Sequence, residues 1–196
     1  MISGISIALK HLKPDIQIIG VEAEGAKAMM QSVKAGKIIP MHNLSTIADG
    51  IAVKNPGDKT FKIIQQHVDD IITVSDKEIA QAMYHLLQRA KIVVEPSGAV
   101  TLAAAIANKQ RFQGKNVVTL ISGGNVNLSL LTQIIEQGML SNHLMGKMII
   151  AVPDKAKVFK DIISVLSNMN VNIQSISLDR SSTSVPIGSV NIHLSF

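Results

Sequence analysis

One segment restricts the fold of this 196-residue chain more than any other. The run Val117 to Ile121 is uncharged and rich in β-branched side chains, and it leads through Ser122-Gly123-Gly124-Asn125 into a helix-like pattern over Leu128 to Gln137 that Gly138 closes. A strand that is apolar on both faces is typical of a parallel sheet covered by helices. We therefore predict a buried strand, a glycine loop and a helix.

The first two-thirds of the chain alternates helix-like with strand-like segments, which predicts an α/β fold with a parallel sheet flanked by helices. Ser75-Asp76-Lys77-Glu78 has the pattern of a capping box, which begins a helix that we expect to run to about Ala90. Gly36 is placed as a C-terminal stop. The other predicted helices are Ile2–Leu12, Gly25–Ala35, Thr60–Val68 and Ala99–Asn108, and the other strands are Ile16–Val21 and Ile71–Val74.

The pattern changes near Ser141-Asn142-His143, and we place a domain boundary near residue 142. The first domain would span 1–142 and the second 143–196. In the second, apolar spacing switches from period 2 to 3.6 and back. This predicts a βαββ order with strands at Met148–Val152, Val171–Leu178 and Ser189–Phe196, a helix at Asp154–Met169 and a turn at Arg180–Pro186.

Composition excludes several classes of function. The chain has no Cys, which removes thiol catalysis and Cys-ligated zinc and fits a reducing, cytoplasmic setting. Its net charge of +5 is spread singly and aromatic residues are 3%, so no nucleic-acid surface is expected. No targeting signal is visible. The uncharged stretch Asn116–Ile135 contains too many polar side chains for a membrane span.

Three loops contain residue types that could carry chemistry. Ser122 and Gly123 end the apolar strand, where ligands bind in open α/β sheets, although the spacing alone favours an ordinary strand-to-helix turn with a Ser cap. Glu95 precedes a helix start, where an acid can simply complement the helix dipole. Gly50 follows Asp49 in a loop that an Asx turn would also explain. The six His residues lack metal-ligand spacing, and no metal site is expected.

The run from Ile2 to about Leu140 resembles threonine ammonia-lyase (threonine dehydratase), a pyridoxal-phosphate enzyme of the tryptophan-synthase-β type and a relative of serine racemase. The order and spacing of the motifs agree over nearly the whole run. The motifs are Ile2-Ser3-Gly4-Ile5, Ile18-Ile19-Gly20-Val21-Glu22, Thr46 to Val53, Asp69-Asp70-Ile71, Glu95-Pro96-Ser97-Gly98-Ala99 and Leu120 to Val126.

The resemblance implies pyridoxal 5′-phosphate as cofactor and gives roles to matched positions. Ser122 corresponds to the residue whose hydroxyl meets the pyridine nitrogen. Glu95, Gly50 and Gly123 correspond to positions around the cofactor ring. A hydroxyl does not hold the ring nitrogen protonated, so the ring withdraws electrons less strongly, which favours loss of the β-hydroxyl over side reactions. Glu22 matches a cation-binding carboxylate of relatives, but Ala28 replaces the second ligand expected there.

Two features of the family are missing from this sequence. There is no Ser-Phe-Lys-like motif with the Schiff-base lysine, and no glycine run stands before Ile2. The chain therefore contains no catalytic lysine, and we expect it to be an internal piece of a longer enzyme that is inactive alone.

Residues from about 143 resemble an ACT domain, a ferredoxin-like module that binds amino acids, here as a partial βαββ unit. Asn170-Val171-Asn172-Ile173 is similar to its Gly-Ala-Asn-Ile motif, which makes Asn172 a candidate effector-binding residue. The resemblance further implies an amino-acid or nucleotide effector and a homo-oligomeric parent.

The sequence thus favours part of an enzyme that converts L-threonine to 2-oxobutanoate and ammonia. One alternative is a non-catalytic, ACT-bearing regulatory subunit that binds an amino acid. Another is a parent similar to serine racemase or serine dehydratase. A generic phosphate-binding α/β protein ranks last, because no Walker lysine follows Gly123-Gly124.

Overall fold

The computed structural model describes all residues, 1–196, and divides them into two compact units, Met1–Ile134 and Ile135–Phe196. The division falls inside helix α7 (Leu128–Ser141), whereas the sequence places the boundary near 142, at the end of that helix. The boundary at 142 stays a prediction. No helix of the chain combines the length and the apolar character needed to cross a bilayer.

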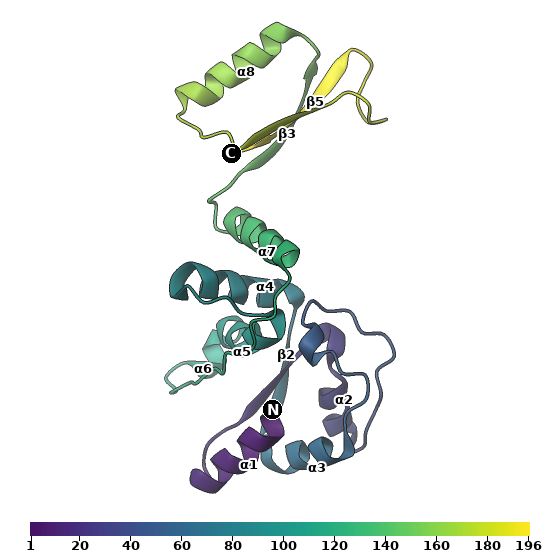
Figure 1. Cartoon of the computed structure of the whole chain (residues 1–196), viewed down its shortest axis with the longest axis vertical. Helices are drawn as coiled ribbons and strands as arrows, with labels where there is room; N and C mark the ends of the chain where they lie inside the picture. The colour runs from purple at the N-terminus through teal and green to yellow at the C-terminus, as the bar shows by residue number, and fades with distance from the viewer. The chain divides into compact units, whose positions relative to one another are not determined.

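The first unit is an α/β arrangement around a two-stranded parallel sheet (Figure 1). Strand β1 (Ile19–Ala23) pairs in parallel with β2 (Asp70–Val74), with Ile19 opposite Asp70 and Ala23 opposite Val74. The predicted α/β class with a parallel sheet is therefore confirmed. The helical elements of this unit are α1 (Ile2–Leu12), η1 (Glu24–Ala26), α2 (Ala28–Ala35), η2 (Asp49–Ile51), α3 (Asp58–His67), α4 (Asp76–His85), the π-helical η3 (Leu86–Ala90), α5 (Pro96–Ala107) and α6 (Lys109–Phe112).

Small residues bring the helices of the first unit close together. Helix α4 packs against α5, which buries Ala99, Ala103 and Ala104. Ile79 in α4 is fully buried, as is Val74 at the end of β2. A helix rich in alanine lets its neighbour approach closely, so the small side chains of α5 pack against larger buried ones such as Ile79 and Tyr84 of α4.

Local signals in the sequence account for several element ends. Ser75 Oγ accepts a hydrogen bond from Glu78 N at 3.3 Å, and Glu78 Oε2 accepts one from Ser75 N at 2.7 Å, so the predicted capping box is confirmed. Gly36 ends α2 with a φ of +69°, in the left-handed region that favours glycine. Pro96 occupies the first turn of α5, where its missing N–H has no partner to lose.

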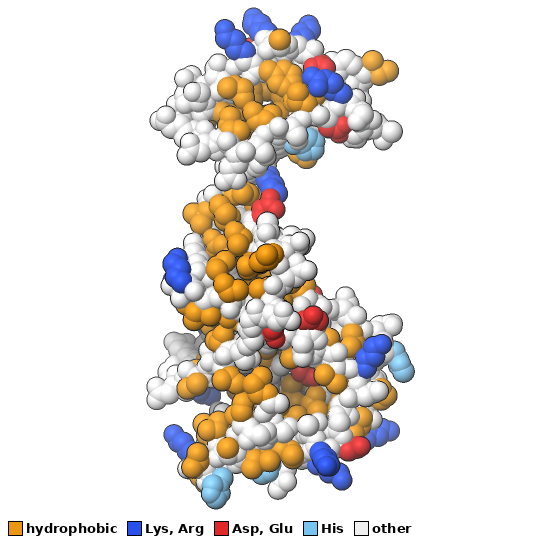
Figure 2. Space-filling view, viewed as in Figure 1, with side chains coloured by type: hydrophobic (Ala, Val, Ile, Leu, Met, Phe, Trp, Pro, Cys, Tyr) orange, Lys and Arg blue, Asp and Glu red, His pale blue; other side chains and the backbone are white.

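The predicted buried strand at 117–121 is wrong. These residues are extended but pair with no strand, and Val118 is 94% exposed. Only β1 and β2 form a sheet in this unit, so the run has no ladder to join. Thr101 Oγ1 donates instead to the Leu120 carbonyl at 2.8 Å. The face of the first unit in Figure 2 is correspondingly rich in exposed hydrophobic side chains.

The second unit is a three-stranded antiparallel sheet with one helix. Its strands are β3 (Lys147–Pro153), β4 (Ser175–Asp179) and β5 (Ser189–Ser195), and α8 (Ala156–Asn168) joins β3 to β4. The sheet order β3-β5-β4 places the last strand between the two that α8 connects. Val190, Ile192 and Leu194 of β5 are buried with Leu166 of α8. This is the βαββ order that the sequence predicts.

Two further bounds differ from expectation. Helix α7 continues through Gly138 to Ser141, because Gly138 is buried in helical conformation and the left-handed residue that follows the helix is His143, with a φ of +57°. Strand β4 begins at Ser175 rather than Val171, because Asn170 adopts a φ of +53° and Val171 N donates back to the Leu166 carbonyl.

Candidate functional site

Three separate segments of the first unit meet at the side chain of Glu95. A Cβ atom built on Gly123 would lie 2.4 Å from Glu95 Cδ, and one built on Gly50 would lie 3.4 Å from Glu95 Oε1. Gly50 belongs to the short turn η2, Glu95 stands directly before α5, and Gly123 belongs to the loop that leads toward α7. The structure therefore brings together three of the residues that the sequence analysis singled out.

Hydrogen bonds hold Glu95 to the Gly123 loop from both its backbone and its side chain. Glu95 N donates to the Gly123 carbonyl at 3.2 Å, and Glu95 Oε2 accepts from Asn125 N at 3.1 Å. The carboxylate thus fixes the loop that follows Ser122. Glu95 is also the residue directly before α5, so this contact is additional to the helix-dipole role that the sequence left open.

Glycine is required at two positions, Gly123 in this loop and Gly98 in helix α5, which packs against it. Gly123 has a φ of +72°, which side chains rarely adopt. A Cβ on Gly98 would lie 1.4 Å from the Ser122 carbonyl oxygen, so any other residue at position 98 would displace the Ser122 backbone from α5. The Glu-Pro-Ser-Gly sequence therefore serves the close approach of two backbones as well as the start of a helix.

Ser122 lies half-buried where the extended segment meets the glycine loop. Its backbone carbonyl rests against α5 at Gly98. Its side chain does not line the cavity described below. The structure therefore places Ser122 next to the Glu95 cluster along the chain, and the contact of its hydroxyl with a cofactor stays a prediction.

Ser97 is a residue that the sequence analysis quoted but gave no role. Its Oγ is a buried side-chain atom without a hydrogen-bond partner, and a Cβ on Gly50 would lie 2.6 Å from it. Buried hydroxyls without a partner are uncommon and call for an explanation. The sequence signal that could have identified Ser97 is its position between Pro96 and Gly98, in the first turn of a helix next to the loops of Gly50 and Gly123.

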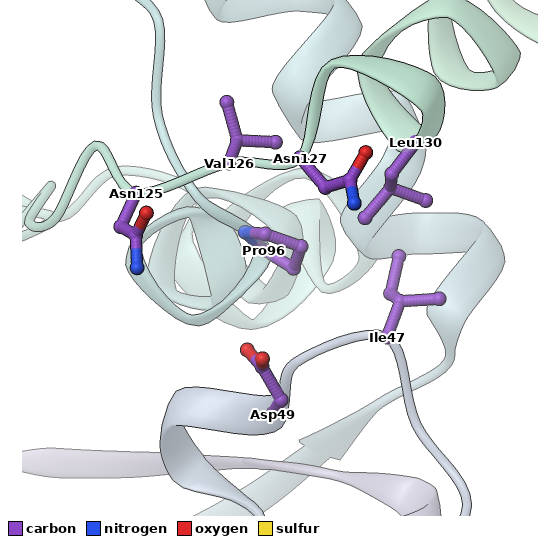
Figure 3. Close-up of a pocket in the computed structure, with 7 residues that line it drawn as sticks. All are labelled: Ile47, Asp49, Pro96, Asn125, Val126, Asn127 and Leu130. Carbon is purple, nitrogen blue, oxygen red and sulfur yellow. The ribbon is translucent and has the colours of Figure 1, made fainter.

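A cavity of about 330 Å³ lies beside this cluster (Figure 3). It is open to solvent and combines one carboxylate, two amide side chains and four apolar residues. This volume falls at the lower end of the range of about 300–1,000 Å³ typical of small-molecule pockets. The lining residues are Ile47, Asp49, Pro96, Asn125, Val126, Asn127 and Leu130.

The remaining candidate residues lie elsewhere. Glu22, at β1, accepts hydrogen bonds from Met29 N at 3.1 Å and Met30 N at 2.8 Å, so its carboxylate caps the start of α2. Burial raises the pKa of Glu22, while the same two backbone N–H groups act to lower it. Asn172 is exposed in the loop between α8 and β4 of the second unit, so it belongs to a different compact unit from Glu95.

Comparisons with known proteins identify the family of the chain. The sequence profile of a family described as pyridoxal-phosphate dependent enzyme matches residues 1–123. An L-threonine ammonia-lyase from Thermotoga maritima is 37% identical over 194 residues, which are 99% of this chain and 48% of that protein. The chain thus spans about half the length of the curated relatives that it matches.

Solved structures give the same picture. The processed form of threonine deaminase isoform 2 from Solanum lycopersicum is similar with a TM-score of 0.66 at 34% identity, over 69% of this chain and 40% of that one. A maize serine racemase gives a TM-score of 0.62 at 37% identity, over 72% of this chain and 44% of that one. Gly50, Glu95 and Gly123 all lie within the range that the family profile covers.

Proposed function

From the premise that this chain belongs to the family of pyridoxal-phosphate dependent enzymes, we propose that it forms part of a threonine ammonia-lyase. The overall reaction converts L-threonine to 2-oxobutanoate and ammonia. Water is lost when the β-hydroxyl is eliminated and is taken up again when ammonia is released by hydrolysis, so the reaction has no net consumption of water. Relatives that carry the name L-threonine ammonia-lyase support this choice.

One observation carries the proposal. Gly50, Glu95 and Gly123 correspond to cofactor positions of the family, and they meet at one place although they come from three segments. An unrelated strand-to-helix turn would not require Gly50 and Gly123 to lie against the same carboxylate. The convergence therefore supports a shared role for these loops.

The residues present fit the ring side of pyridoxal phosphate. Ser97 Oγ is buried without a partner beside Gly50, which is what an unfilled polar position next to a bound group would look like. The two glycines let the Glu95 and Ser97 side chains pack directly against the loops that carry them. Ser122 adds a hydroxyl that can donate to a ring nitrogen. These residues would hold the ring, while the phosphate needs donors other than theirs.

When bound, the cofactor supplies an electron sink for the carbon that loses its proton. The chain's own residues would orient that sink. The Ser122 hydroxyl would donate to the pyridine nitrogen without protonating it, because an alcohol is far too weak an acid at neutral pH. Glu95 holds Asn125 N and the Gly123 carbonyl, which fixes the backbone that carries Ser122.

Catalysis needs a lysine that this sequence does not offer in a family motif. We therefore propose that the 196 residues alone release no 2-oxo acid, and that a segment carrying this lysine completes the site. The structure is consistent with such a partner surface, because Val117, Val118 and Leu120 are exposed apolar residues directly before Ser122.

The test combines the full chain with the lysine-bearing N-terminal part of the Thermotoga maritima relative, in trans or fused, and follows 2-oxobutanoate release from L-threonine. We expect pyridoxal-phosphate-dependent turnover that drops about tenfold in Ser122→Ala, since a hydrogen bond to a polar group in a desolvated site is worth about 1.5 kcal/mol. Ser141→Ala, an exposed serine at the end of α7, is the control. Absence of turnover with a cofactor spectrum that Ser122→Ala leaves unchanged would remove the proposal.

The similarity to a maize serine racemase favours a second candidate parent. In the same assembled protein, release of D-serine from L-serine in excess over 2-oxo acid would select the racemase. Excess 2-oxobutanoate from L-threonine would select the ammonia-lyase.

We also propose that the second unit is an ACT-type module that binds an amino-acid or nucleotide effector within a homo-oligomeric parent. The inserted position of β5 between β3 and β4, with α8 on one face, supports the ferredoxin-like topology. Asn172 lies exposed in the loop after α8, where a ligand can reach it.

A further inference from the structure

The carboxylate of Asp49 lies against the nitrogen of the peptide bond that follows it. Gly50 N donates a hydrogen bond to Asp49 Oδ1 at 2.8 Å. Both residues are exposed, and Asp49 lines the cavity that is open to solvent. In Figure 3 the Asp49 carboxylate projects from its turn toward Asn125 and Pro96. The carbon Cγ, which is bonded to Oδ1, is therefore held close to the nitrogen of the next residue, at a place that water can reach.

Gly50 N takes no part in the backbone hydrogen bonds of its turn. Ile51 N donates to the Ala48 carbonyl at 3.2 Å, and Ala52 N donates to the Asp49 carbonyl at 3.0 Å. Gly50 N donates to the side chain of the preceding residue instead. The turn η2 is a three-residue 3₁₀ segment, and short exposed segments of this kind open at a small cost in free energy. The Asp49 backbone can therefore rotate enough for Cγ to face the Gly50 nitrogen.

A second aspartate shows why glycine matters at position 50. Ile71 N donates to Asp70 Oδ1 at 2.8 Å, the same distance as in the Asp49 contact, and Asp70 is exposed as well. Ile71, however, has a branched side chain next to its nitrogen, and it lies in β2, which pairs with β1. Gly50 has no side chain to obstruct the approach of Cγ. The two contacts are alike in distance and differ in what surrounds the nitrogen.

We propose that Asp49 is a site of spontaneous covalent modification, at which it isomerises to isoaspartate through a succinimide. The Gly50 nitrogen forms a bond to Asp49 Cγ and loses its proton, and the protonated carboxyl releases one oxygen as water. A water molecule then adds to one imide carbonyl and breaks its bond to the nitrogen. Addition at Cγ restores aspartate, and addition at the main-chain carbonyl gives isoaspartate. The water released in the first step equals the water taken up in the second.

Isoaspartate would displace the loop that carries Gly50. It adds one carbon to the main chain directly before Gly50, where space is short. A Cβ on Gly50 would lie 2.6 Å from Ser97 Oγ and 3.4 Å from Glu95 Oε1. The longer backbone would therefore move Gly50 away from these two side chains and break the hydrogen bonds of Ile51 N and Ala52 N. The new α-carboxylate is exposed, so a protein isoaspartate methyltransferase can reach it.

The experiment is prolonged incubation of the full chain in mildly acidic buffer, without cofactor. Isoaspartate is measured by methyl transfer from labelled S-adenosylmethionine with an isoaspartate methyltransferase, and it is located by peptide mapping with electron-transfer fragmentation. We expect isoaspartate to form at Asp49 at least about tenfold faster than at Asp70. Asp49→Glu should abolish this signal, because the longer side chain must close a larger ring. Asp58→Glu, at an exposed acid of the same unit, is the matched control and should react like the unchanged chain.

A parallel incubation in urea separates the effect of the fold from that of the sequence. We expect the folded chain to react within about tenfold of the rate in urea, because the exposed turn opens readily. The proposal is overturned by absence of isoaspartate at Asp49, by equal rates at Asp49 and Asp70, or by stronger protection in the folded chain. No cofactor and no second segment are added, so these outcomes are independent of the proposed function.

Discussion

The two units of this chain reach a folded state in different ways. In the second unit every strand has a partner, with β5 paired along its length to β3 and over five residues to β4. In the first unit a single pair, β1 with β2, forms the whole sheet. The first unit also contains tight contacts at Gly50, Gly98 and Gly123. Both units therefore bury large apolar side chains, such as Ile79 in the first and Ile192 in the second, and the first adds places where a glycine leaves no room for a Cβ.

This difference indicates where each unit is sensitive to mutation. Adding a single carbon at a tight glycine should damage the first unit, whereas the second unit should be most sensitive to loss of volume at the buried residues of β5. The lone tyrosine, Tyr84, is buried in α4, so its fluorescence reports on the first unit. Hydrogen exchange measured by mass spectrometry reports on both.

The largest expected effect is that of Ile192→Ala. Ile192 is 1% exposed in the middle of β5, opposite Ile150 and Leu178. We expect a loss of about 4 kcal/mol in the stability of the second unit, because the lost contacts and the cavity add up. Exchange protection should fall across β3, β4 and β5 while the Tyr84 transition stays in place.

Val165→Ala, at a 57% exposed position of α8, is the control for this variant and should cost less than about 1 kcal/mol. If Ile192→Ala shifts the Tyr84 transition as well, the two units unfold together and the contrast between them fails.

Gly98→Ala makes the opposite change to Ile192→Ala, because it adds one carbon atom at a tight position of the first unit. The new Cβ would lie 1.4 Å from the Ser122 carbonyl oxygen, so the backbone must move. We expect about 3 kcal/mol of destabilisation in denaturant unfolding followed by Tyr84 fluorescence. Gly4→Ala is the matched control, because nothing lies within 4 Å of a Cβ at that helical position, and it should stabilise by about 1 kcal/mol. Equal behaviour of the two variants would mean that the approach at Gly98 is not tight.

Ser75→Ala tests how much one local sequence signal, the capping box at the start of α4, contributes to the stability of the first unit. Ser75 caps the helix that contains Tyr84, and its loss leaves the Glu78 N–H without an acceptor. We expect a cost of about 1 kcal/mol by Tyr84 fluorescence. Gln81→Ala, at an exposed position of the same helix, should change the stability by only a few tenths of a kcal/mol. A similar cost in both variants would show that helix propensity, not the cap, is being measured.

The smallest expected effect concerns pH and the second unit. Hydrogen bonds from Arg180 lower the pKa of Asp154 below its ordinary value. A carboxyl whose pKa is lower when folded binds fewer protons in the folded state, so stability falls as the pH drops below the ordinary Asp pKa of about 4. Asp154→Asn should flatten this decline in thermal unfolding followed by circular dichroism. Asp161→Asn, an exposed acid of α8, should leave it unchanged, and an unchanged slope in Asp154→Asn would contradict the assignment.

The sequence predicts the second unit well because apolar alternation marks its strands clearly. The apolar alternation in β3 and β5 carries enough information to place both strands within a residue or two. The prediction from alternation fails only at β4. Asn170 adopts a left-handed conformation that delays the start of this strand, and an apolar pattern does not reveal the backbone conformation of a polar residue.

The first unit is harder to predict. The helices and the parallel pairing follow from periodicity, but the run Val117–Ile121 has a strand pattern without a strand. An apolar β-branched sequence indicates that a segment suits a sheet, not that a neighbouring strand is present. The motifs identified Gly50, Glu95 and Gly123, whereas the unpartnered hydroxyl of Ser97 follows only from packing that no spacing reveals.

The central claim is that the Ser122 hydroxyl faces a pyridine nitrogen, and one titration tests it most directly. The ligand is 4′-deoxypyridoxine 5′-phosphate, which has no aldehyde and so cannot react with surface lysines. The chain assembled with the lysine-bearing N-terminal part should bind it saturably, with affinity about fivefold lower in Ser122→Ala, the loss expected for one neutral hydrogen bond, and unchanged in Ser141→Ala. Equal affinity in the unchanged chain and Ser122→Ala, or no binding at all, would contradict the account.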